Sequence, residues 1–368
     1  MALSRGDDFP IHQTSEPIAY AGTDRNFYDR YFFNGYGPEG EPFFAVAFGV
    51  YPQANIADAS FCIVQEGTQT ALHASRWLEM ERMNLTVGPI CITVIEPLQK
   101  LRVRVSAPEK GVEADIIFEG RAFPLEEPRF TRRIGPRAMM DYTRLTQNGR
   151  WSGWIELDGK RRSVEGFFGT RDRSWGVRPI GARDAQAIVP PVEPQFYWIW
   201  APANFEAGSF FFHSNEDAAG QPWNRRAAWA RDGADAAAIS DIAESSLKVE
   251  FKSGTRHAKR AEVTVREEGG ERRITYEPLY EFFMLGLGYG HPKWGHGAAH
   301  GEALAVERED MELAKVDVRR PQHLHVQAVC KVSYEGPGHR AEGQGVLEQL
   351  IFGPHAPSGF AGALDFAK

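Results

Sequence analysis

The chain contains 368 residues, of which 42% are hydrophobic and 25% are charged, and its formal net charge is -7. This composition excludes a disordered or collagen-like protein. The acidic balance argues against a nucleic-acid partner, because phosphate binding needs a basic surface. No apolar run is long enough to span a bilayer, and no signal peptide is visible, so we expect a cytoplasmic protein without stable membrane insertion.

The length predicts two domains, because a chain of this size exceeds the usual single hydrophobic core. We place them at residues 1–185 and 186–368. The many glycines, prolines and aromatic residues favour short strands and turns over long helices. Cys62, Cys91 and Cys330 lie in apolar runs, and we interpret them as buried thiols in a reducing compartment.

The first half of the chain is expected to form strands. Aromatic runs on both sides of residues 35–40 predict a hairpin with a long loop. Further strands are predicted at residues 57–64, 68–80, 90–96, 101–105 and 112–118. Residues 76–82 have a composition that leaves strand and helix open.

The chain then approaches its middle through turns. Residues 121–137 contain three prolines and a basic cluster, and we expect an irregular crossing segment there. Residues 142–164 are predicted as strands that turn at Asn148-Gly149 and again at Asp158-Gly159. Both dipeptides favour two-residue hairpin turns.

The stretch GFFGTRDRSWGVRP, residues 166–179, concentrates glycines, charges and one tryptophan. Glycine permits a positive φ or a close backbone approach, so we expect a sharp, ordered loop or a bulged strand. Such a loop would place Asp172 and Trp175 close together, and sites tend to lie on loops held by a rigid scaffold. The alternative is a clasp between domains, in which Asp172 pairs with an arginine.

The second half is also expected to be rich in strands. Proline-rich residues 189–194 are interpreted as the linker, and FYWIWA, residues 196–201, as a strand buried on both faces. Other strands are predicted at residues 208–213, 226–231, 247–251, 261–267 and 324–334, and one short helix at residues 234–245. The pattern predicts an all-β protein of two antiparallel barrels or sandwiches, with less than about a tenth of helix.

Nine of the eleven histidines follow residue 200, so we expect any imidazole site in the second half. The segment at residues 286–302 contains His291, Trp294 and His296. Neutral imidazole is a common metal ligand, and a metal site is one interpretation of this segment. The other interpretation is a hydrogen-bonded loop that helps to line a pocket. No cysteine and no HExxH motif accompany the histidines, and we predict that the chain binds no metal ion and no cofactor.

Glu348 and Gln349 are adjacent in an otherwise apolar strand, so one of them faces inward. A carboxyl group in an apolar site has a raised pKa and can act as a general acid. The alternative is that Glu348 pairs with an arginine. No serine-centred elbow, P-loop or CxxC motif supports acyl, phosphoryl or thiol-redox chemistry.

The stretch GTRDRSWGVRP resembles the Gly-x-x-Asp-x-x-Trp-Gly signature of the lipocalin-like carotenoid hydratase (CrtC) and AttH superfamily. The later stretches GYGHPKWGHG and GVLEQLIFGPHAPSGF resemble the C-terminal half of an uncharacterised bacterial branch of it. The resemblance implies two lipocalin-like antiparallel β-barrel domains packed side by side, with a hydrophobic pocket at or between them. It favours strand over helix for residues 76–82, and it maps the shared positions onto Asp172 and Trp175.

The resemblance also implies cofactor-free chemistry, namely hydration of isoprenoid double bonds, cyclisation, or pericyclic reactions of polyketide-derived substrates. After the shared aspartate, this chain has Arg173 where the hydratases usually have histidine. Because arginine cannot release a proton, Arg173 suits the binding of a carboxylate or enolate better than proton transfer.

Acid-catalysed hydration or cyclisation needs a protonated acid and aromatic faces that stabilise a developing cation. The candidate catalytic residues are Asp172, Arg173, Glu348 and His296, and the candidate ligand-binding residues are Trp175, Tyr197, Trp198, His213, His291 and Trp294. We therefore expect a cofactor-independent lyase or isomerase whose partner is a lipophilic isoprenoid-, steroid- or polyketide-like small molecule. The alternatives are a protein that binds a lipophile without changing it, and a metal-dependent β-barrel enzyme that uses the late histidines.

Overall fold

β-Strands make up nearly all of the regular structure in the computed structural model, which describes residues 2–12, 15–180, 193–267 and 269–368. Within these residues there is no α-helix, and no helix is long and apolar enough to cross a membrane. Eight short 3-10 helices occur: η1 (Arg5–Asp8), η2 (Pro52–Ala54), η3 (Pro108–Lys110), η4 (Ala236–Ala238), η5 (Met284–Leu287), η6 (Leu313–Lys315), η7 (Pro321–His323) and η8 (Ala356–Ser358).

The chain forms two units. The first comprises Met1–Gly37, Glu41–Pro190 and Gly286–Ala314, and the second comprises Pro38–Gly40, Pro191–Leu285 and Lys315–Lys368. The predicted boundary at residues 185 and 186, and most of the predicted linker, lie outside the described residues.

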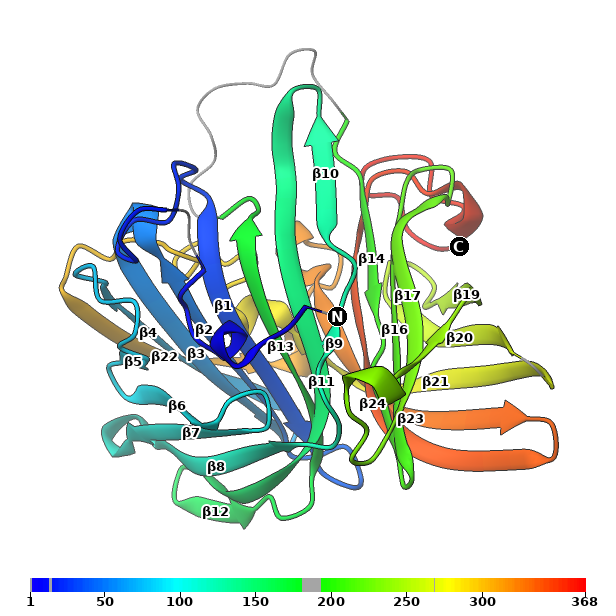
Figure 1. The fold of residues 1–368 in the computed structure, drawn as a ribbon, viewed down its shortest axis with the longest axis horizontal. Helices are drawn as coiled ribbons and strands as arrows, with labels where there is room; N and C mark the ends of the chain where they lie inside the picture. The colour runs from blue at the N-terminus through cyan, green and yellow to red at the C-terminus, as the bar shows by residue number, and fades with distance from the viewer. Residues whose placement is uncertain (1, 13–14, 181–192, 268) are drawn as a thin grey trace. The chain divides into compact units, whose positions relative to one another are not determined.

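One sheet of 14 strands builds the first unit (Figure 1). Its strands are β1 (Phe27–Tyr36), β2 (Phe43–Tyr51), β3 (Ile56–Gln65), β4 (Thr68–Trp77), β5 (Thr86–Val87), β6 (Ile90–Glu96), β7 (Lys100–Ala107), β8 (Val112–Gly120), β9 (Leu125–Glu126), β10 (Phe130–Ile134), β11 (Arg137–Leu157), β12 (Lys160–Ser163), β13 (Phe168–Val177) and β22 (Leu304–Glu312). The strand order is β22-β4-β3-β2-β1-β13-β11-β8-β7-β6-β5, and β9, β10 and β12 pair with β11.

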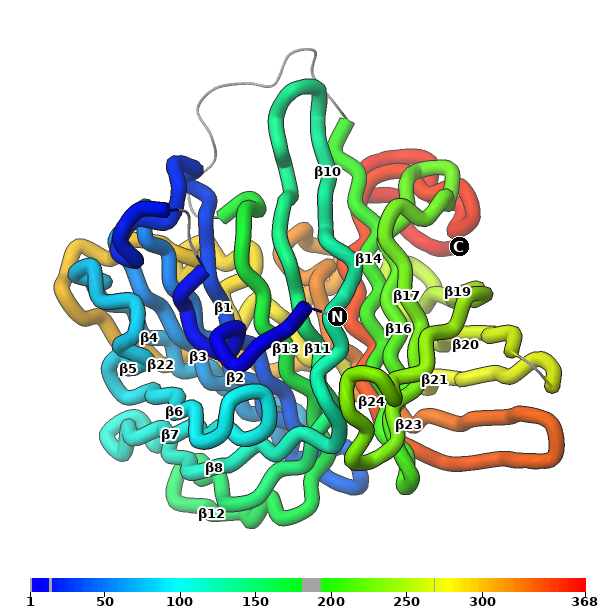
Figure 2. Tube along the Cα trace, in the orientation of Figure 1, coloured from blue at the N-terminus to red at the C-terminus, as the bar shows by residue number. Residues whose placement is uncertain are grey.

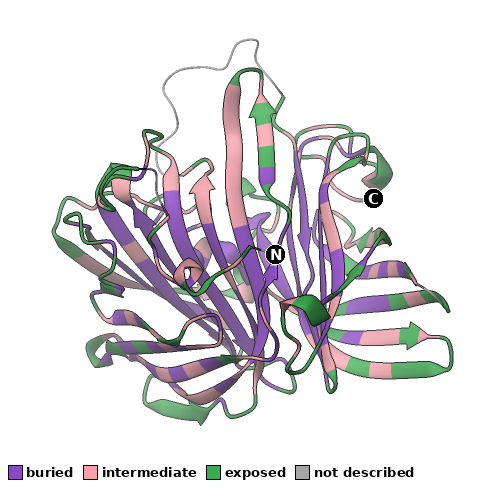
Figure 3. Ribbon diagram, in the orientation of Figure 1, coloured by how far each residue is buried: buried purple, intermediate pink, exposed green. Residues whose placement is uncertain are grey.

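The core of the first unit lies on one face of this sheet, because alternate residues of a strand share a face. Tyr31 and Phe33 of β1 point into it and are fully buried. The sheet curves until β5, at one end, approaches β4, which is second from the other end; there Nε of Arg76 in β4 donates a hydrogen bond of 2.7 Å to the carbonyl of Thr86 in β5. The result is a nearly closed barrel whose long strands are buried over most of their length (Figure 3).

The second unit contains a sheet of ten strands. They are β14 (Phe196–Trp200), β15 (Ala203–Phe205), β16 (Gly208–Glu216), β17 (Pro222–Arg231), β18 (Ser240–Ile242), β19 (Glu244–Phe251), β20 (Ala258–Glu267), β21 (Gly270–Phe283), β23 (Val326–Gly336) and β24 (His339–Phe352). The order is β18-β17-β16-β14-β24-β23-β21-β20-β19, with β15 beside β16 and β24. Ile199, Phe210 and Cys330 are among the residues of its separate core.

The all-β prediction is confirmed: each unit is built on an antiparallel sheet, and the sheet of the first unit forms the nearly closed barrel. The predicted hairpin around residues 35–40 is formed by β1 and β2. The predicted strand at residues 196–201 is β14, whose residues are all buried. Tyr197 and Ile199 point into the core of the second unit, and Phe196, Trp198 and Trp200 lie on the other face, so burial on both faces is confirmed.

The predicted turn at Asn148-Gly149 is wrong, because β11 runs straight through both residues. Gly149 pairs with Gly169 of β13. A Cβ on Gly149 would lie 2.2 Å from Cζ of Phe118, so glycine is required here for close packing and not for a turn. The turn at Asp158-Gly159 is confirmed by φ values of 50° and 77°, the left-handed conformation that two-residue hairpin turns need.

The stretch at residues 166–179 is neither a loop nor a bulged strand. It contains β13, which pairs without a register shift with β1 on one side and β11 on the other. Every second side chain of β13 therefore faces the core of the first unit, and the others face away from it.

The predicted helix at residues 234–245 is wrong. The segment contains η4, whose first turn is capped by the side chain of Asp235, and then β18. Residues 240–242, which the composition assigned to the helix, instead form β18 and pair with β17. Residues 76–82 begin as the end of β4 and continue as turns, and residues 121–137 include β9 and β10, so that segment is more regular than expected.

The late histidine segment belongs to the first unit, which corrects the expectation that imidazole sites lie in the second half. β22 pairs with β4 from Leu304↔Arg76 to Glu312↔Thr68, and the gold trace of this segment runs beside the blue strands in Figure 2. Cys62 and Cys330 are buried thiols as predicted, whereas Cys91 is partly exposed because the neighbouring isoleucines of β6 face inward.

Candidate active site

The face of the first sheet that points away from its core carries a row of polar residues. Arg144 of β11 pairs with Ser174 of β13, which pairs with Arg30 of β1. Arg30 is opposite Gly49 of β2, and Gly49 is opposite Asp58 of β3. We call this surface, defined by Arg30, Asp58, Arg144, Asp172 and Ser174, the polar face.

Asp58 is the acidic group at the β3 end of the polar face. The hydroxyl of Tyr51 donates to its Oδ1 at 3.2 Å, and the backbone N–H of Gly297 donates to its Oδ2 at 2.7 Å. Position 49, which lies on β2 opposite Asp58, requires glycine, because a Cβ there would lie 2.3 Å from the hydroxyl oxygen of Tyr51. Burial raises the pKa of Asp58 from 3.8 to about 6, although Arg30 and the two hydrogen bonds act to lower it. A carboxyl group with this pKa is protonated often enough near neutrality to act as a general acid.

Arg30 and Arg178 converge on the same atom, Nδ1 of His296, at 3.3 Å each. The other ring nitrogen of His296, Nε2, lies 3.0 Å from the carbonyl oxygen of Leu287 and therefore donates to it. His296 is thus a neutral imidazole whose Nδ1 accepts from two cations. In this arrangement its ring positions the arginines and does not present a proton to a ligand.

Tyrosine rings surround the two arginines. The guanidinium of Arg178 lies over the ring of Tyr28 at 4.6 Å, and that of Arg30 over the ring of Tyr289 at 5.0 Å. Burial raises the pKa of Tyr28 to about 12, so its hydroxyl stays protonated at neutral pH. The tyrosines supply aromatic faces and neutral hydroxyl donors.

Asp172 also belongs to the polar face, one row further along β13. It pairs with Phe32 of β1 and interacts electrostatically with Tyr28 and Arg144. Arg144 itself donates to Oε2 of Glu127 at 2.6 and 2.9 Å. The predicted candidate Asp172 therefore lies on the same surface as Asp58.

Arg173 and Trp175 lie on the opposite face of β13 from Asp172. Arg173 forms an ion pair with Asp29 and donates to the carbonyl of Arg30 at 3.0 Å. Trp175 stacks on the ring of His12 with centroids 3.7 Å apart. His12 of the N-terminal segment thus covers Trp175, and the structure brings neither Arg173 nor Trp175 to the predicted acid.

The candidates His291 and Trp294 lie beside His73 of β4 and Glu309 of β22. One nitrogen of each histidine and one oxygen of Glu309 lie within 4.8 Å of one another, a spacing that a metal ion could bridge. However, Nδ1 of His291 accepts the backbone N–H groups of Lys293 and Trp294, at 3.1 and 2.8 Å. The proton must then be on Nε2, which donates to Glu309 at 2.9 Å and has no lone pair for a metal. This hydrogen-bonded arrangement does not suit a metal ion.

Glu348 accepts the hydrogen bonds of a second polar cluster, which lies in the second unit. Trp198 Nε1 and His325 Nε2 donate to its Oε1 at 3.1 and 2.8 Å, and Gln327 Nε2 donates to its Oε2 at 2.7 Å. The ring of His213 lies 5.9 Å from that of Trp198. The structure therefore brings together the predicted residues Glu348, Trp198 and His213.

Tyr197 is separated from this cluster, because it points into the core of the second unit. Its ring stacks on His355 with centroids 4.0 Å apart.

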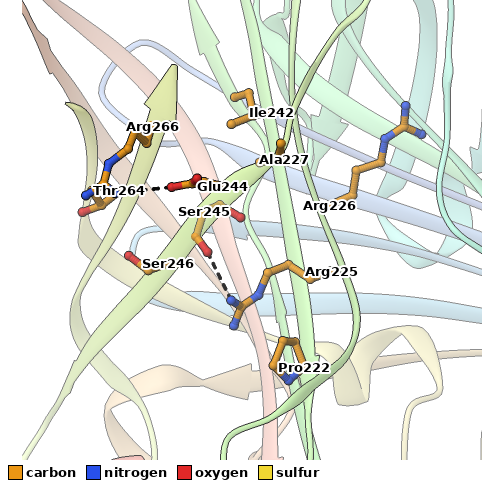
Figure 4. Close-up of a pocket in the computed structure, with 11 residues that line it drawn as sticks. Pro222, Arg225, Arg226, Ala227, Ile242, Glu244, Ser245, Ser246, Thr264 and Arg266 are labelled. Atoms are coloured by element: carbon orange, nitrogen blue, oxygen red, sulfur yellow. Dashed lines mark hydrogen bonds and ion pairs between the residues drawn. The ribbon is translucent and has the colours of Figure 1, made fainter. Parts of the chain in front are cut away.

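A cavity of about 560 Å³ opens on the second sheet where β17 and β18 approach β19 and β20 (Figure 4). Three arginines contribute to its wall, and Arg225 donates to the carbonyl of Ser245 across it at 3.2 Å. Arg226 pairs with Asp241, and Arg266 with Glu244. This charged lining is unsuited to a lipophilic molecule.

Sequence reasoning missed Asp58, Arg30 and Tyr51. A signal for Asp58 was present, because it is a lone charge within the otherwise apolar run of β3. That is the same feature that singled out Glu348. No local signal indicates that Gly297, far away in the sequence, completes the carboxyl's hydrogen bonds.

Comparison with known proteins places the chain among proteins of this fold. The family of unknown function DUF8625 matches residues 3–361. No curated protein matches the sequence. Among solved structures, an AttH-like protein from Nitrosomonas europaea is 15% identical with a TM-score of 0.52, and the match covers 89% of this chain and 94% of that chain. CghA, crystallised with Sch210972, is 11% identical with a TM-score of 0.51, and the match covers 94% and 95% of the two chains.

Proposed function

Because the chain belongs to the DUF8625 family, whose function is unknown, its activity must be inferred from its own site, and we propose that it is a cofactor-independent lyase or isomerase. It acts by acid catalysis on a hydrophobic isoprenoid-, steroid- or polyketide-like small molecule. The observation that carries this proposal is the carboxyl group of Asp58, whose pKa is raised to about 6 beside tyrosine rings.

The proposed step begins with transfer of the Asp58 proton to one carbon of a substrate double bond. The Asp58 carboxylate that remains is stabilised by the hydrogen bonds from Tyr51 and Gly297. In an isomerase, this carboxylate then removes a proton from a neighbouring carbon, which shifts the double bond. In a hydratase, water adds to the substrate and loses a proton to Asp58. Both cycles return Asp58 to its starting state without an oxidant or reductant.

The fold supports a small-molecule ligand. CghA, which shares this fold, has been crystallised with Sch210972. The alternative proposal is that the chain binds a lipophile without changing it. Under either proposal we expect no nucleic-acid partner and a cytoplasmic location.

Incorporation of solvent deuterium tests the proposal on a panel of candidate substrates. The protein is incubated in D₂O with isoprenoid, steroid-like and polyketide-like alkenes, and the recovered molecules are analysed by mass spectrometry. A proton donor leaves deuterium on carbon, and hydration adds the mass of water. Asp58→Asn removes the acid and keeps the side-chain size, and we expect it to lower the rate by about 10²–10⁴-fold.

Asp115→Asn is the matched control, because Asp115 pairs with Arg102 on the exposed side of the first sheet. The control should react like the wild type. Retention of bound alkenes with no deuterium on carbon would support the binding protein, and full activity of Asp58→Asn would remove Asp58 from the mechanism.

A further inference from the structure

Among the described residues, Arg30 and Arg178 have no carboxylate within ion-pair distance. Within residues 2–12, 15–180, 193–267 and 269–368, neither guanidinium forms a salt bridge. Three buried arginines on strands of the first sheet do form ion pairs, Arg171 with Asp8, Arg173 with Asp29 and Arg144 with Glu127. The two arginines that converge on His296 therefore differ from these three in having no ion-pair partner among the described residues.

The hydrogen bonding of the two arginines is also incomplete. Arg30 is 3% exposed, and its Nε has no partner, although its terminal nitrogens reach His296 and the carbonyl of Leu287. The Nε of Arg178 is likewise buried without a partner. Burying a charged donor without an acceptor is costly, and two like charges that share one neutral acceptor repel each other. A bound anion would accept hydrogen bonds from both guanidinium groups and would offset their positive charges.

The chemistry of the site leads to the same requirement. Protonation of a neutral alkene by Asp58 would create a carbocation beside two uncompensated positive charges. That repulsion would oppose the step. A substrate that already carries a negative oxygen, as a carboxylate or an enolate, would neutralise the arginines, and carbon protonation by Asp58 would then meet less repulsion.

We propose that Arg30 and Arg178 clamp an acidic oxygen group, a carboxylate or an enolate, of the lipophilic substrate. This rests on the proposed function and deepens it by naming the substrate class as a lipophilic acid. Guanidinium groups suit this role because their planar donors match the two oxygens of a carboxylate. His296 acts as a positioning residue, since it holds both guanidinium groups at one point.

The clamp also couples substrate binding to the protonation of Asp58. The positive charge of Arg30 lowers the pKa of Asp58. An anion bound at the clamp offsets that charge, so binding favours the protonated form of Asp58. A lipophilic acid should therefore bind with net uptake of protons near pH 7, which calorimetry in buffers of different ionisation enthalpy measures.

Farnesoic acid and farnesol are suitable probes, because they share one isoprenoid chain and differ in charge. Their dissociation constants are measured at pH 7.5 for the wild type and for Arg30→Gln, Arg178→Gln and Arg30→Lys. Arg102→Gln on the exposed side of the sheet is the matched control. Circular dichroism establishes that each variant is folded, and Arg30→Lys keeps the charge if Arg30→Gln does not fold.

We expect the wild type to bind farnesoic acid at least tenfold more tightly than farnesol. Arg30→Gln and Arg178→Gln should each remove most of this preference and leave farnesol binding nearly unchanged. Arg30→Lys should keep part of the preference, and Arg102→Gln all of it. Equal affinity of the wild type for the two probes, no binding of either, or a preference that survives both glutamine variants would overturn the clamp.

The deuterium experiment separates the clamp from the proposed function. Deuterium on neutral alkenes without any preference for farnesoic acid would refute the clamp and leave the acid catalyst standing. A strong, arginine-dependent preference without deuterium on any carbon would support the clamp and refute the catalyst.

Discussion

Asp29 and Asp58, which lie on opposite faces of the first sheet, are in contrasting electrostatic states. Burial would raise the pKa of Asp29, but the charge of Arg173 and the hydrogen bonds from His12 and Arg173 lower it instead. Asp58 has no guanidinium within ion-pair distance among the described residues, and its pKa is raised to about 6. When two carboxyl groups have pKa values shifted in opposite directions, the one with the lowered pKa stays charged, and the one with the raised pKa can act as an acid.

Asp58→Asn should stabilise the protein, and only at higher pH. Because the folded pKa of about 6 exceeds the ordinary 3.8, folding favours the protonated carboxyl, and stability is lost as the pH rises through this range. Asparagine resembles the protonated form at every pH. At about 1.4 kcal/mol per pKa unit, the gain at pH 8 has an upper limit of about 3 kcal/mol.

Thermal melts of the wild type and Asp58→Asn between pH 4 and pH 8 measure this gain. The two melting temperatures should coincide near pH 4, separate progressively between pH 4 and pH 6, and keep a nearly constant difference above pH 6. A difference that is constant with pH would mean that the Asp58 pKa is not raised.

Asp29→Asn should have the opposite effect, with a loss of about 3–5 kcal/mol of unfolding free energy at neutral pH, because it leaves the buried Arg173 without its partner. The stabilising contribution of Asp29 is present above its ordinary pKa and is lost on acidification. Asp115→Asn, which breaks a partly exposed pair, should lose at most about 1 kcal/mol. Urea titrations of both variants at pH 7 compare the two losses, and equal losses would contradict the assignment of Asp29 as a core ion-pair partner.

At the scale of the strands, a row of glycines shapes the first sheet. Gly35 of β1, Gly169 of β13, Gly149 of β11 and Gly120 of β8 are consecutive cross-strand neighbours. The row leaves space for large side chains, because a Cβ on Gly169 would lie 2.3 Å from Nε1 of Trp151. These glycines therefore serve packing between strands.

Gly149→Ala should destabilise the protein by about 1–3 kcal/mol, the usual range for overpacking. Its new Cβ would meet both Cζ of Phe118 at 2.2 Å and the backbone oxygen of Glu119 at 2.6 Å. Gly362→Ala is the control, because the nearest atom to its Cβ would be Oδ1 of Asp365 at 3.7 Å. A Gly149→Ala variant as stable as Gly362→Ala would show that this row is not closely packed.

The strands themselves could be predicted where one face is apolar, as in β7, whose inward residues alternate with exposed ones. The prediction failed at Asn148-Gly149, because an Asn-Gly dipeptide can occur in a turn or at a point of close packing within a strand. Which of the two it forms depends on the neighbouring strands, which the dipeptide itself does not reveal. The alanines of residues 236–238 suggested a helix, but pairing of β18 with β17 limits it to one turn.

At the scale of the whole molecule, the polar face could be predicted only in part. Asp172 was identified because its motif is local in the sequence. The partner of Asp58 is Gly297, which reaches it because β22 pairs with β4 across more than 200 residues of sequence. A single sequence carries no signal for such a pairing. The fold class was predictable because alternation and turns recur along the entire chain.

Metal removal should have no effect on this molecule. His291 donates its Nε2 proton to Glu309, so the histidine cluster holds hydrogen bonds that a metal ion would have to break. We expect EDTA and added Zn²⁺ to leave the melting temperature and any deuterium incorporation unchanged, and elemental analysis to find no stoichiometric transition metal. A melting temperature that rises in proportion to bound zinc would contradict this account.

The pH dependence of deuterium incorporation tests the central claim, that Asp58 is the proton donor, most directly. With a reactive alkene at a concentration well below its KM, kcat/KM should be highest at acidic pH and should decline above an apparent pKa of about 6. Asp115→Asn should show the same profile, and Asp58→Asn should retain only a small, flat residual rate. A profile that is independent of pH between 5 and 8, or one that keeps its decline in Asp58→Asn, would contradict the account.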